Sequence, residues 1–314
     1  GIIEAVTRRM RAGIADLPDG KYEFTDVLDD DGMGTTNIPI CVKIDIQSDE
    51  IWLNFEGSAP QVTGNMNNSF AGLQASVLFA LKVLIDPDGP TNHGMLDPVH
   101  IDAPEASVVN ASFPAATAAR AQTCQRIIDV ILGALAPAVP ERVIAACNGA
   151  NGVATFSGEG PDGQYYLYME TIGGGAGGRS YKDGSDGIQV HVTNTSNLPV
   201  EALENEYPLL VERYELVENS GGAGKWRGGM GLRRVYRGLG HTLTFSGQGE
   251  RAVTPPWGLF GGKGGGTGSI SLINPDGSKE LLDIKPASLQ VEPTKAVCIE
   301  TVSYTHLRAH ETEA

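Results

Sequence analysis

The chain has 314 residues, 41% of them hydrophobic, so it is long enough to bury a sizeable core. Its formal net charge of −15 excludes a nucleic-acid surface that follows the phosphates, because such a surface needs clustered Lys and Arg. The most apolar run, residues 70–85, is too short for a membrane span and contains Gln74, Ser76 and Lys82. We therefore expect no membrane segment and no nucleic-acid partner.

The cysteines are widely separated and none belongs to a CxxC pair; they are Cys41, Cys124, Cys147 and Cys298. A chain of this length does not need disulfides to fold. We therefore expect reduced thiols and a cytoplasmic protein. Cys124 falls on the apolar stripe of a predicted helix, which favours a small core residue.

Apolar residues between positions 2 and 14 share one helical face, up to a stop at Leu17-Pro18-Asp19-Gly20. The chain begins at Gly1, already inside this pattern, so we expect an N-terminally truncated fragment. The segment Asp29-Asp30-Asp31-Gly32 lacks the ligand spacing of an EF-hand and is interpreted as a turn. Residues 40–46 and 51–55 then alternate apolar and polar side chains, which predicts a β-hairpin across residues 47–50.

Two long helices are predicted next. The first covers residues 70–85 and stops at Asp86-Pro87, and the second covers residues 119–135 and ends before Pro137. Short strands dominate afterwards, at residues 165–171, 188–193, 209–217, 232–237, 242–246, 269–273, 280–284 and 296–300. The order favours an α+β fold, strand-rich with two long buried helices and many glycine-rich loops, over a doubly wound parallel sheet.

Residues 302–314 are mostly polar and show no helical or strand-like repeat of apolar residues. They look like translated adapter sequence. We therefore expect one domain over residues 1–301, followed by a non-native tail at 302–314. Excluding the tail removes His306 and His310, an i, i+4 pair that otherwise suggests metal ligands.

Two glycine-rich segments are similar to nucleotide-binding loops. Residues 173–178 satisfy GxGxxG, but residues 179–184 are poor at opening a helix, so a dinucleotide site is not favoured. Backbone amides that approach a ligand or another chain, and a plain turn, remain alternatives. Residues 220–226 are similar to a Walker A loop, yet Asn219 and Trp226 replace its first Gly and its Ser or Thr. Any ATP site must come largely from another chain.

His191 faces the polar side of the predicted strand, next to Asn194 and Asn197, so it either contacts substrate or is a solvated surface histidine. Glu201 and Glu204 share one face of a predicted short helix with a proline at its first position. They are paired carboxylates for a metal or a proton transfer, or first-turn acids that complement the helix dipole. The remaining histidines form no HxxxH, HxH or HxxD motif, so no metal site is predicted within this chain.

An ordered set of short motifs extends from Leu17 to about Thr301. Its members are Leu17-Pro18-Asp19-Gly20, Phe55-Glu56-Gly57-Ser58-Ala59-Pro60-Gln61, Asp86-Pro87, Pro140-Glu141-Arg142-Val143, residues 173–178, Asn197-Leu198-Pro199-Val200-Glu201, Glu206-Tyr207-Pro208-Leu209, residues 220–229, and Glu250-Arg251 before Pro256-Trp257-Gly258. In this order they resemble the C-terminal part of the hydantoinase B/5-oxoprolinase family, B-type subunits related to acetone carboxylase subunits.

The resemblance implies a catalytic subunit of an ATP-dependent hydrolase that opens cyclic amides, hydantoins or 5-oxoproline, the latter in glutathione metabolism. In that family an A-type subunit with an actin-like ATPase fold phosphorylates the ring carbonyl oxygen, so ATP enters through the partner. A divalent metal lowers the pKa of water to about 7 for attack on the ring. The family's His and Asp metal ligands lie upstream of this sequence, so we expect the isolated fragment to be inactive.

Two alternatives stay open: a subunit of an acetone- or acetophenone-type carboxylase, and a glycine-rich, non-catalytic binding or assembly module. From motif position and polar side-chain type, we predict that five residues shape a substrate pocket or the interface between subunits. They are His191, Asn194, Glu201, Arg227 and Arg251. The resemblance assigns no catalytic residue and no metal ligand within this chain.

Overall fold

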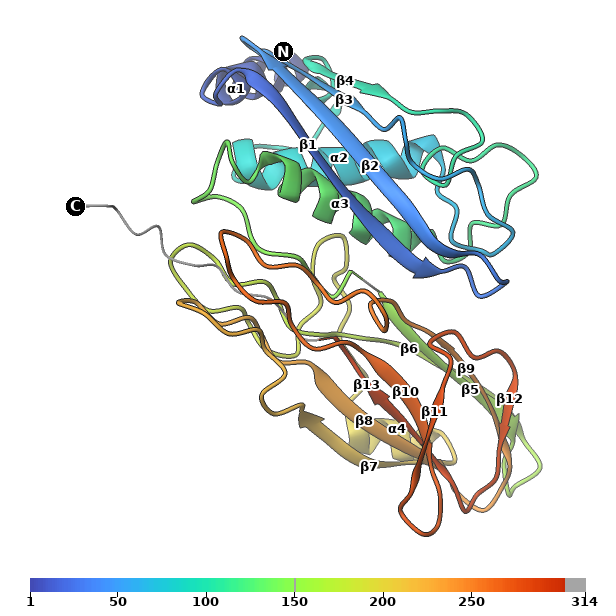
Figure 1. Cartoon of the computed structure of the whole chain (residues 1–314). Coiled ribbons are helices and arrows are strands. Elements are labelled where there is room, and N and C mark those ends of the chain that lie inside the picture. The colour runs from blue at the N-terminus through green and yellow to red at the C-terminus, as the bar shows by residue number, and fades with distance from the viewer. Residues whose placement is uncertain (150, 303–314) are drawn as a thin grey trace. The chain divides into compact units, whose positions relative to one another are not determined.

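The computed structural model describes residues 1–149 and 151–302 and divides the chain into two units (Figure 1). The first unit comprises residues 1–145 and 179–181, and the second comprises residues 146–178 and the chain from 182 onward. The described residues form four α-helices and thirteen strands in three sheets, which confirms the predicted α+β fold. Within them, no helix is both long and apolar enough to cross a membrane. His306 and His310 lie outside the described residues.

The first unit is built on a four-stranded sheet in the order β1-β2-β3-β4. β1 (Gly20–Asp30), β2 (Thr36–Gln47) and β3 (Glu50–Asn54) are antiparallel, and β4 (Val99–Asp102) runs parallel to β3. The predicted hairpin is confirmed, with Gln47 opposite Glu50. β1 continues through Asp30, so the turn predicted at residues 29–32 begins two residues too early.

Three helices supply the apolar partners of this sheet: α1 (Ile2–Ala15), α2 (Phe70–Ile85) and α3 (Arg120–Leu135). A short 3-10 helix, η1 (His93–Met95), precedes β4. The alternating β2 residues Ile40, Val42 and Ile44 are at most 1% exposed and form the centre of the core. α3 packs so closely on β1 that a Cβ added at Gly133 would lie 2.9 Å from the Phe24 ring. Cys124 is a free, half-buried thiol on α3, and burial raises its pKa.

The second unit is a sandwich of two sheets with strand orders β11-β10-β13-β8-β7 and β12-β9-β5-β6. Their inner faces share one apolar core, in which the Phe156 ring lies 4.6 Å from Tyr236 and 5.2 Å from Phe245. A short helix, α4 (Val200–Glu206), completes it. The strands are β5 (Gly152–Glu159), β6 (Tyr165–Ile172), β7 (Leu209–Leu216), β8 (Leu232–Gly238), β9 (Leu243–Gln248), β10 (Ser269–Ile273), β11 (Lys279–Leu282), β12 (Leu289–Val291) and β13 (Ala296–Glu300).

The strand predicted at residues 188–193 is wrong. Ile188 makes an isolated bridge to Gly174, and His191 has a φ of 51°, which no regular strand accommodates. Its neighbour Val192 is 43% exposed, so the alternating apolar side chains do not share a buried face. This segment is a loop, held at one point against the glycine-rich residues 173–178.

The glycine-rich segments of the second unit pack backbone against backbone. The amide N–H of Ala176 donates to the Ser185 carbonyl at 2.8 Å, and the Gly229 N–H donates to the Ala176 carbonyl at 2.9 Å. A Cβ at Gly184 would lie 1.9 Å from the Ala176 oxygen, and one at Gly229 would lie 2.1 Å from the Ser185 oxygen. Glycine is required here because no side chain fits between the crossing backbones.

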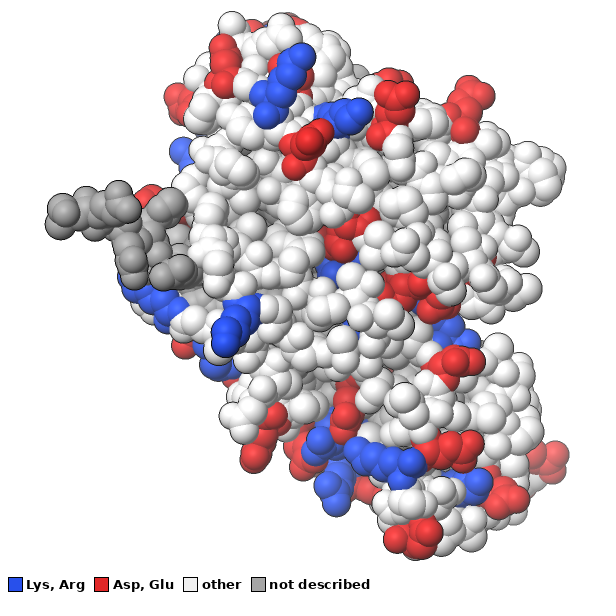
Figure 2. Space-filling model, viewed as in Figure 1, with Lys and Arg blue, Asp and Glu red and all other residues white. Residues whose placement is uncertain are grey.

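Charged side chains are mixed on the visible surface. Figure 2 shows Lys and Arg lying beside Asp and Glu on the described residues of both units, rather than gathering into a basic face. This distribution agrees with the acidic composition.

Candidate functional site

A polar pocket of about 340 Å³ lies in the second unit, between the glycine-rich segment after β6 and the loop before α4. Its size suits a small organic molecule. It is lined by Gly173, Gly187, Ile188, Gln189, Thr193, Asn194, Thr195, Ser196 and Asn197. These lining residues offer carboxamides, hydroxyls and backbone groups, and none has an ionisable side chain.

Local backbone geometry forms the pocket wall. Gly187 adopts a φ of 58°, and Ile188 then exchanges two hydrogen bonds with Gly174, at 3.0 and 2.5 Å. The chain folds back where the Thr193 N–H donates to the Val190 carbonyl at 3.2 Å. The polar run from Thr193 to Asn197 is therefore left at the surface instead of entering a sheet.

A buried polar network supports the pocket from the core side. Arg234 on β8 forms an ion pair with Glu170 on β6 at 2.7 Å, and their side chains are 0% and 6% exposed. The Tyr236 hydroxyl donates to the same carboxylate. Burial raises the pKa of Tyr236 well above its usual value, so the phenol stays protonated as a donor. This network joins the two sheets through an ion pair and one charge-assisted hydrogen bond.

Asn197 connects that network to the pocket. Its Nδ2 donates to Glu170 Oε2 and to the Thr171 carbonyl, each at 2.8 Å. Asn197 also lines the pocket, so a buried ion pair fixes the orientation of a side chain at the candidate site.

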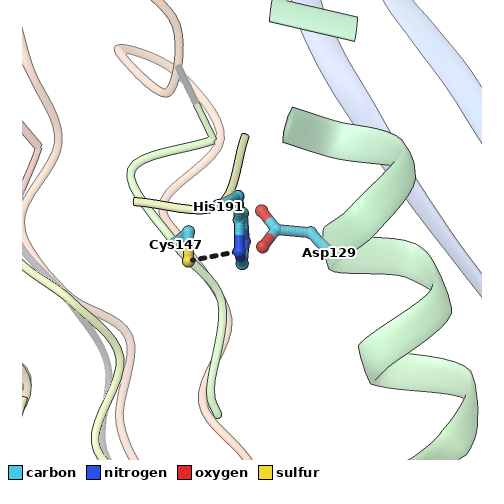
Figure 3. A group of neighbouring side chains, drawn as sticks. All are labelled: Asp129, Cys147 and His191. Atoms are coloured by element: carbon cyan, nitrogen blue, oxygen red, sulfur yellow. Dashed lines mark hydrogen bonds between the residues drawn. The ribbon is translucent and has the colours of Figure 1, made fainter. Parts of the chain in front are cut away.

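His191 lies in the same loop and contacts Cys147, with 3.7 Å between His191 Nδ1 and Cys147 Sγ (Figure 3). Cys147 is fully buried, and His191 has a left-handed φ of 51°, an uncommon backbone conformation for a residue with a side chain. The separation is close to the ~3.5 Å ligand edge expected for a tetrahedral Zn²⁺ with one Cys and one His. Within the described residues of the second unit, these two donors fall short of the three or four protein ligands of such a site.

The third residue labelled in Figure 3, Asp129, belongs to α3 of the first unit and is 1% exposed. α3 also buries Arg126, whose Nη1 lies 3.4 Å from Asp26 Oδ1 on β1. Arg126 is thus paired within the first unit, which the apolar stripe of the sequence did not reveal.

The five predicted residues have different surroundings. Asn194 lines the pocket, and His191 lies in the loop that forms it, beside Cys147. Arg227 donates from Nη1 and Nη2 to Asp186, at 2.7 and 3.1 Å. Arg251 is fully buried with a φ of 60°, and its carbonyl accepts from Gly268. Neither arginine is among the residues that line the pocket.

Glu201 is exposed on the first turn of α4. Glu204 Oε1 instead accepts a hydrogen bond from the Val211 N–H at 2.9 Å, which joins α4 to β7. Pro199 is the N-cap residue rather than the first helical residue, a correction of one position. This arrangement favours first-turn acids with structural roles over a carboxylate pair for a metal.

Two other hollows are less suitable. One, in the second unit beside Asn148 and Val302, holds only 30 Å³, room for about two water molecules. The other, about 500 Å³, lies in the first unit over β1, β2 and β3, and Lys21, Glu23, Lys43 and Asp45 line it. The polar pocket combines adequate volume, neutral hydrogen-bonding groups and a predicted residue, Asn194.

The chain belongs to the hydantoinase B/oxoprolinase family, whose sequence profile matches residues 1–303. This match confirms the family resemblance derived from the ordered motifs.

The B-type subunit of a putative D-/L-hydantoinase from Pseudomonas sp. is 35% identical over 276 residues, which cover 84% of this chain and 46% of that protein. The crystal structure of the ATP-dependent caprolactamase from Pseudomonas jessenii matches with a TM-score of 0.84 and 25% identity, over 98% of this chain and 54% of the other. A nucleotide-free acetone carboxylase structure matches with a TM-score of 0.82 at 13% identity, over 98% and 47% of the two chains, and shares the fold alone. The chain spans about half the length of these proteins.

Proposed function

We propose that this chain is part of a B-type subunit that opens cyclic amides in an ATP-dependent reaction, with its polar pocket binding the ring. The observation that carries the proposal is the family match over residues 1–303, together with a pocket lined by neutral amide and hydroxyl groups. Relatives named as a hydantoinase subunit and an ATP-dependent caprolactamase support the same reaction class.

The chemistry of the pocket suits such a substrate. A small cyclic amide holds its N–H and C=O on one edge, because the ring enforces the cis form. Asn194 and Gln189 carry carboxamides, each with a carbonyl acceptor and an NH₂ donor, and Thr195 adds a hydroxyl. Neutral donors and acceptors bind a neutral ring without leaving a buried charge unpaired.

The remaining components are proposed to come from outside the described residues. An A-type ATPase subunit is proposed to supply the ATP site, since the amides of Gly174 and Ala176, in the segment similar to GxGxxG, already donate to the Ile188 and Ser185 carbonyls. A divalent metal, with ligands outside this sequence, would activate water for ring opening by lowering its pKa. Hydantoins, 5-oxoproline and lactams are the proposed substrate classes.

The test uses the purified chain with hydantoin, 5-oxoproline and caprolactam. We expect binding of at least one ring by calorimetry, and no ring opening when the chain is mixed with ATP and Mg²⁺ alone. Adding an A-type subunit and the upstream part of a B-type subunit should produce ring opening that depends on ATP. Turnover by the chain alone would contradict the proposed division of labour, and absence of binding to any ring would favour a non-catalytic module.

The carboxylase alternative has the shared fold in its favour and no further observation. The same reconstituted pair separates the two reactions, because a carboxylase consumes ATP only with a ketone and bicarbonate. ATP consumption that requires bicarbonate would reject the hydrolase proposal.

A further inference from the structure

We infer that Asn197 is a specificity-determining residue, which presents its carboxamide oxygen as a fixed acceptor for a ring N–H. The inference rests on the proposed function and names its substrate class more narrowly: cyclic amides whose ring nitrogen carries a hydrogen. It follows from hydrogen bonds inside the second unit.

Both hydrogens of the Asn197 amide are used in hydrogen bonds within the second unit. One is donated to Glu170 Oε2 and the other to the Thr171 carbonyl. A carboxylate and a carbonyl only accept hydrogen bonds, so a flipped amide would place its oxygen against two further oxygens. The network therefore fixes which atom of the Asn197 carboxamide is the nitrogen and which is the oxygen.

Glu170 is itself held in place. Its carboxylate is held by Arg234 at 2.7 Å and by the Tyr236 hydroxyl, and its side chain is only 6% exposed. The Arg234 guanidinium in turn lies 4.2 Å from the centre of the Tyr214 ring, a cation–π contact. Glu170 is thus a positioning residue, which acts on the pocket through Asn197.

The remaining polar atom of the Asn197 side chain is its oxygen, Oδ1. With both hydrogens engaged, Asn197 has only its Oδ1 lone pairs to offer to the pocket that it lines. A ligand must bring a donor to meet them. A site built around a hydrogen bond strongly disfavours an analogue that lacks the matching group, since the polar group of the site is left unpaired.

The probe pair is 2-pyrrolidinone and N-methyl-2-pyrrolidinone, which differ at one ring nitrogen. Ligand-observed NMR titrations of the full chain should give at least about tenfold weaker binding for the N-methyl compound. In N197A, the affinity for 2-pyrrolidinone should fall to that of the N-methyl compound. N274A is the matched control, because Asn274 lies in the turn between β10 and β11 and is not among the residues that line the pocket, so this variant should keep both affinities.

E170Q tests the positioning step. The new carboxamide can donate a hydrogen bond to a turned Asn197, so that only the Thr171 carbonyl still opposes the turn, and the ratio should fall toward one while 2-pyrrolidinone still binds. Circular dichroism and the melting temperature report whether this variant folds; if it does not, N197A carries the test alone.

The outcomes separate the two claims. Equal binding of the two compounds by the unaltered chain would overturn the role of Asn197 and leave the proposed function standing. Stronger N-methyl binding in N197A, with unchanged 2-pyrrolidinone binding, would show that the selection is steric and would also overturn the inference. Absence of binding by either lactam, hydantoin or 5-oxoproline would contradict the proposed function itself.

Discussion

Asp186 holds together two glycine-rich segments of the second unit. Its carboxylate accepts both Arg227 Nη1 and Nη2, and Oδ1 also accepts the Met230 N–H at 2.7 Å. The bidentate pair fixes the geometry of the Arg227 side chain, which the sequence suggested for the substrate pocket or the subunit interface. The hydrogen bonds from Arg227 lower the pKa of Asp186.

This pair predicts an acid-sensitive part of the stability. Because the folded pKa of Asp186 lies below the unfolded value of about 4, its contribution is complete above that value and is lost as pH falls through the folded pKa. D186N should lower the free energy of unfolding by about 1 kcal/mol at pH 7, since the pair is partly exposed, and by less at pH 3. Urea titrations at both pH values measure the difference.

E218Q is the control for D186N, because Glu218 is exposed and makes no hydrogen bond within the described residues. It should leave the unfolding free energy unchanged at both pH values. An equal loss for D186N at pH 7 and pH 3 would contradict the ionic origin of the effect.

The site residues were predictable from the sequence only in part. Asn194, predicted from motif position and polar side-chain type, lines the candidate pocket. Glu170 was missed, although the alternation of Tyr166, Tyr168 and Glu170 places a carboxylate on the buried face of a strand. Such a group needs a buried cation, yet Arg234 is 64 positions away, and no local pattern joins the two.

At the scale of helices and strands, the predicted bounds are right where neighbouring residues cap or end the element. α2 has the predicted bounds, because Ser69 accepts a hydrogen bond from the Gly72 N–H at its start and Asp86-Pro87 ends it. It failed at residues 188–193, where alternating apolar residues suggested a strand. There the backbone is set by Gly187 and His191, both at positive φ, and by pairing with a distant glycine segment.

The glycine segments give the second prediction. G184A should lower the free energy of unfolding by about 3 kcal/mol, because the new Cβ meets the backbone at Ala176 and Gly229, which has no room to move. Chemical denaturation followed by circular dichroism measures the loss. G266A lies in another glycine-rich run, where the nearest atom to the added Cβ is at 3.5 Å, and should cost at most about 1 kcal/mol. Similar losses for both variants would argue against close packing as the cause.

At the scale of the whole molecule, the first residue of the expected non-native tail, Val302, packs with the second unit. Val302 is 3% exposed, and its carbonyl accepts a hydrogen bond from the Gly175 N–H at 3.4 Å. Val302 therefore belongs with the second unit by its packing. The sequence gives little indication of this packing, since a single valine before a polar run forms no helical or strand-like repeat of apolar residues.

Two truncations test this boundary. Deleting residues 303–314 should leave the melting temperature within about 1 °C, because these residues look foreign to the family. Deleting from Val302 onward should lower it by a further ~2–4 °C, since about 1.5 kcal/mol of apolar burial is lost. Differential scanning calorimetry of both variants gives the comparison, and a large drop for the shorter deletion would reject the foreign tail.

The division of the chain into units also limits how such a protein can be cut and recombined. Residues 179–181 belong to the first unit although second-unit residues flank them on both sides, and the Ser180 hydroxyl donates to the Glu141 carbonyl at 2.9 Å. A gene fragment ending at residue 145 would lose this returning segment, together with the bridge between Ile144 and Arg179. A first unit expressed alone would therefore lack contacts that only the later part of the chain supplies.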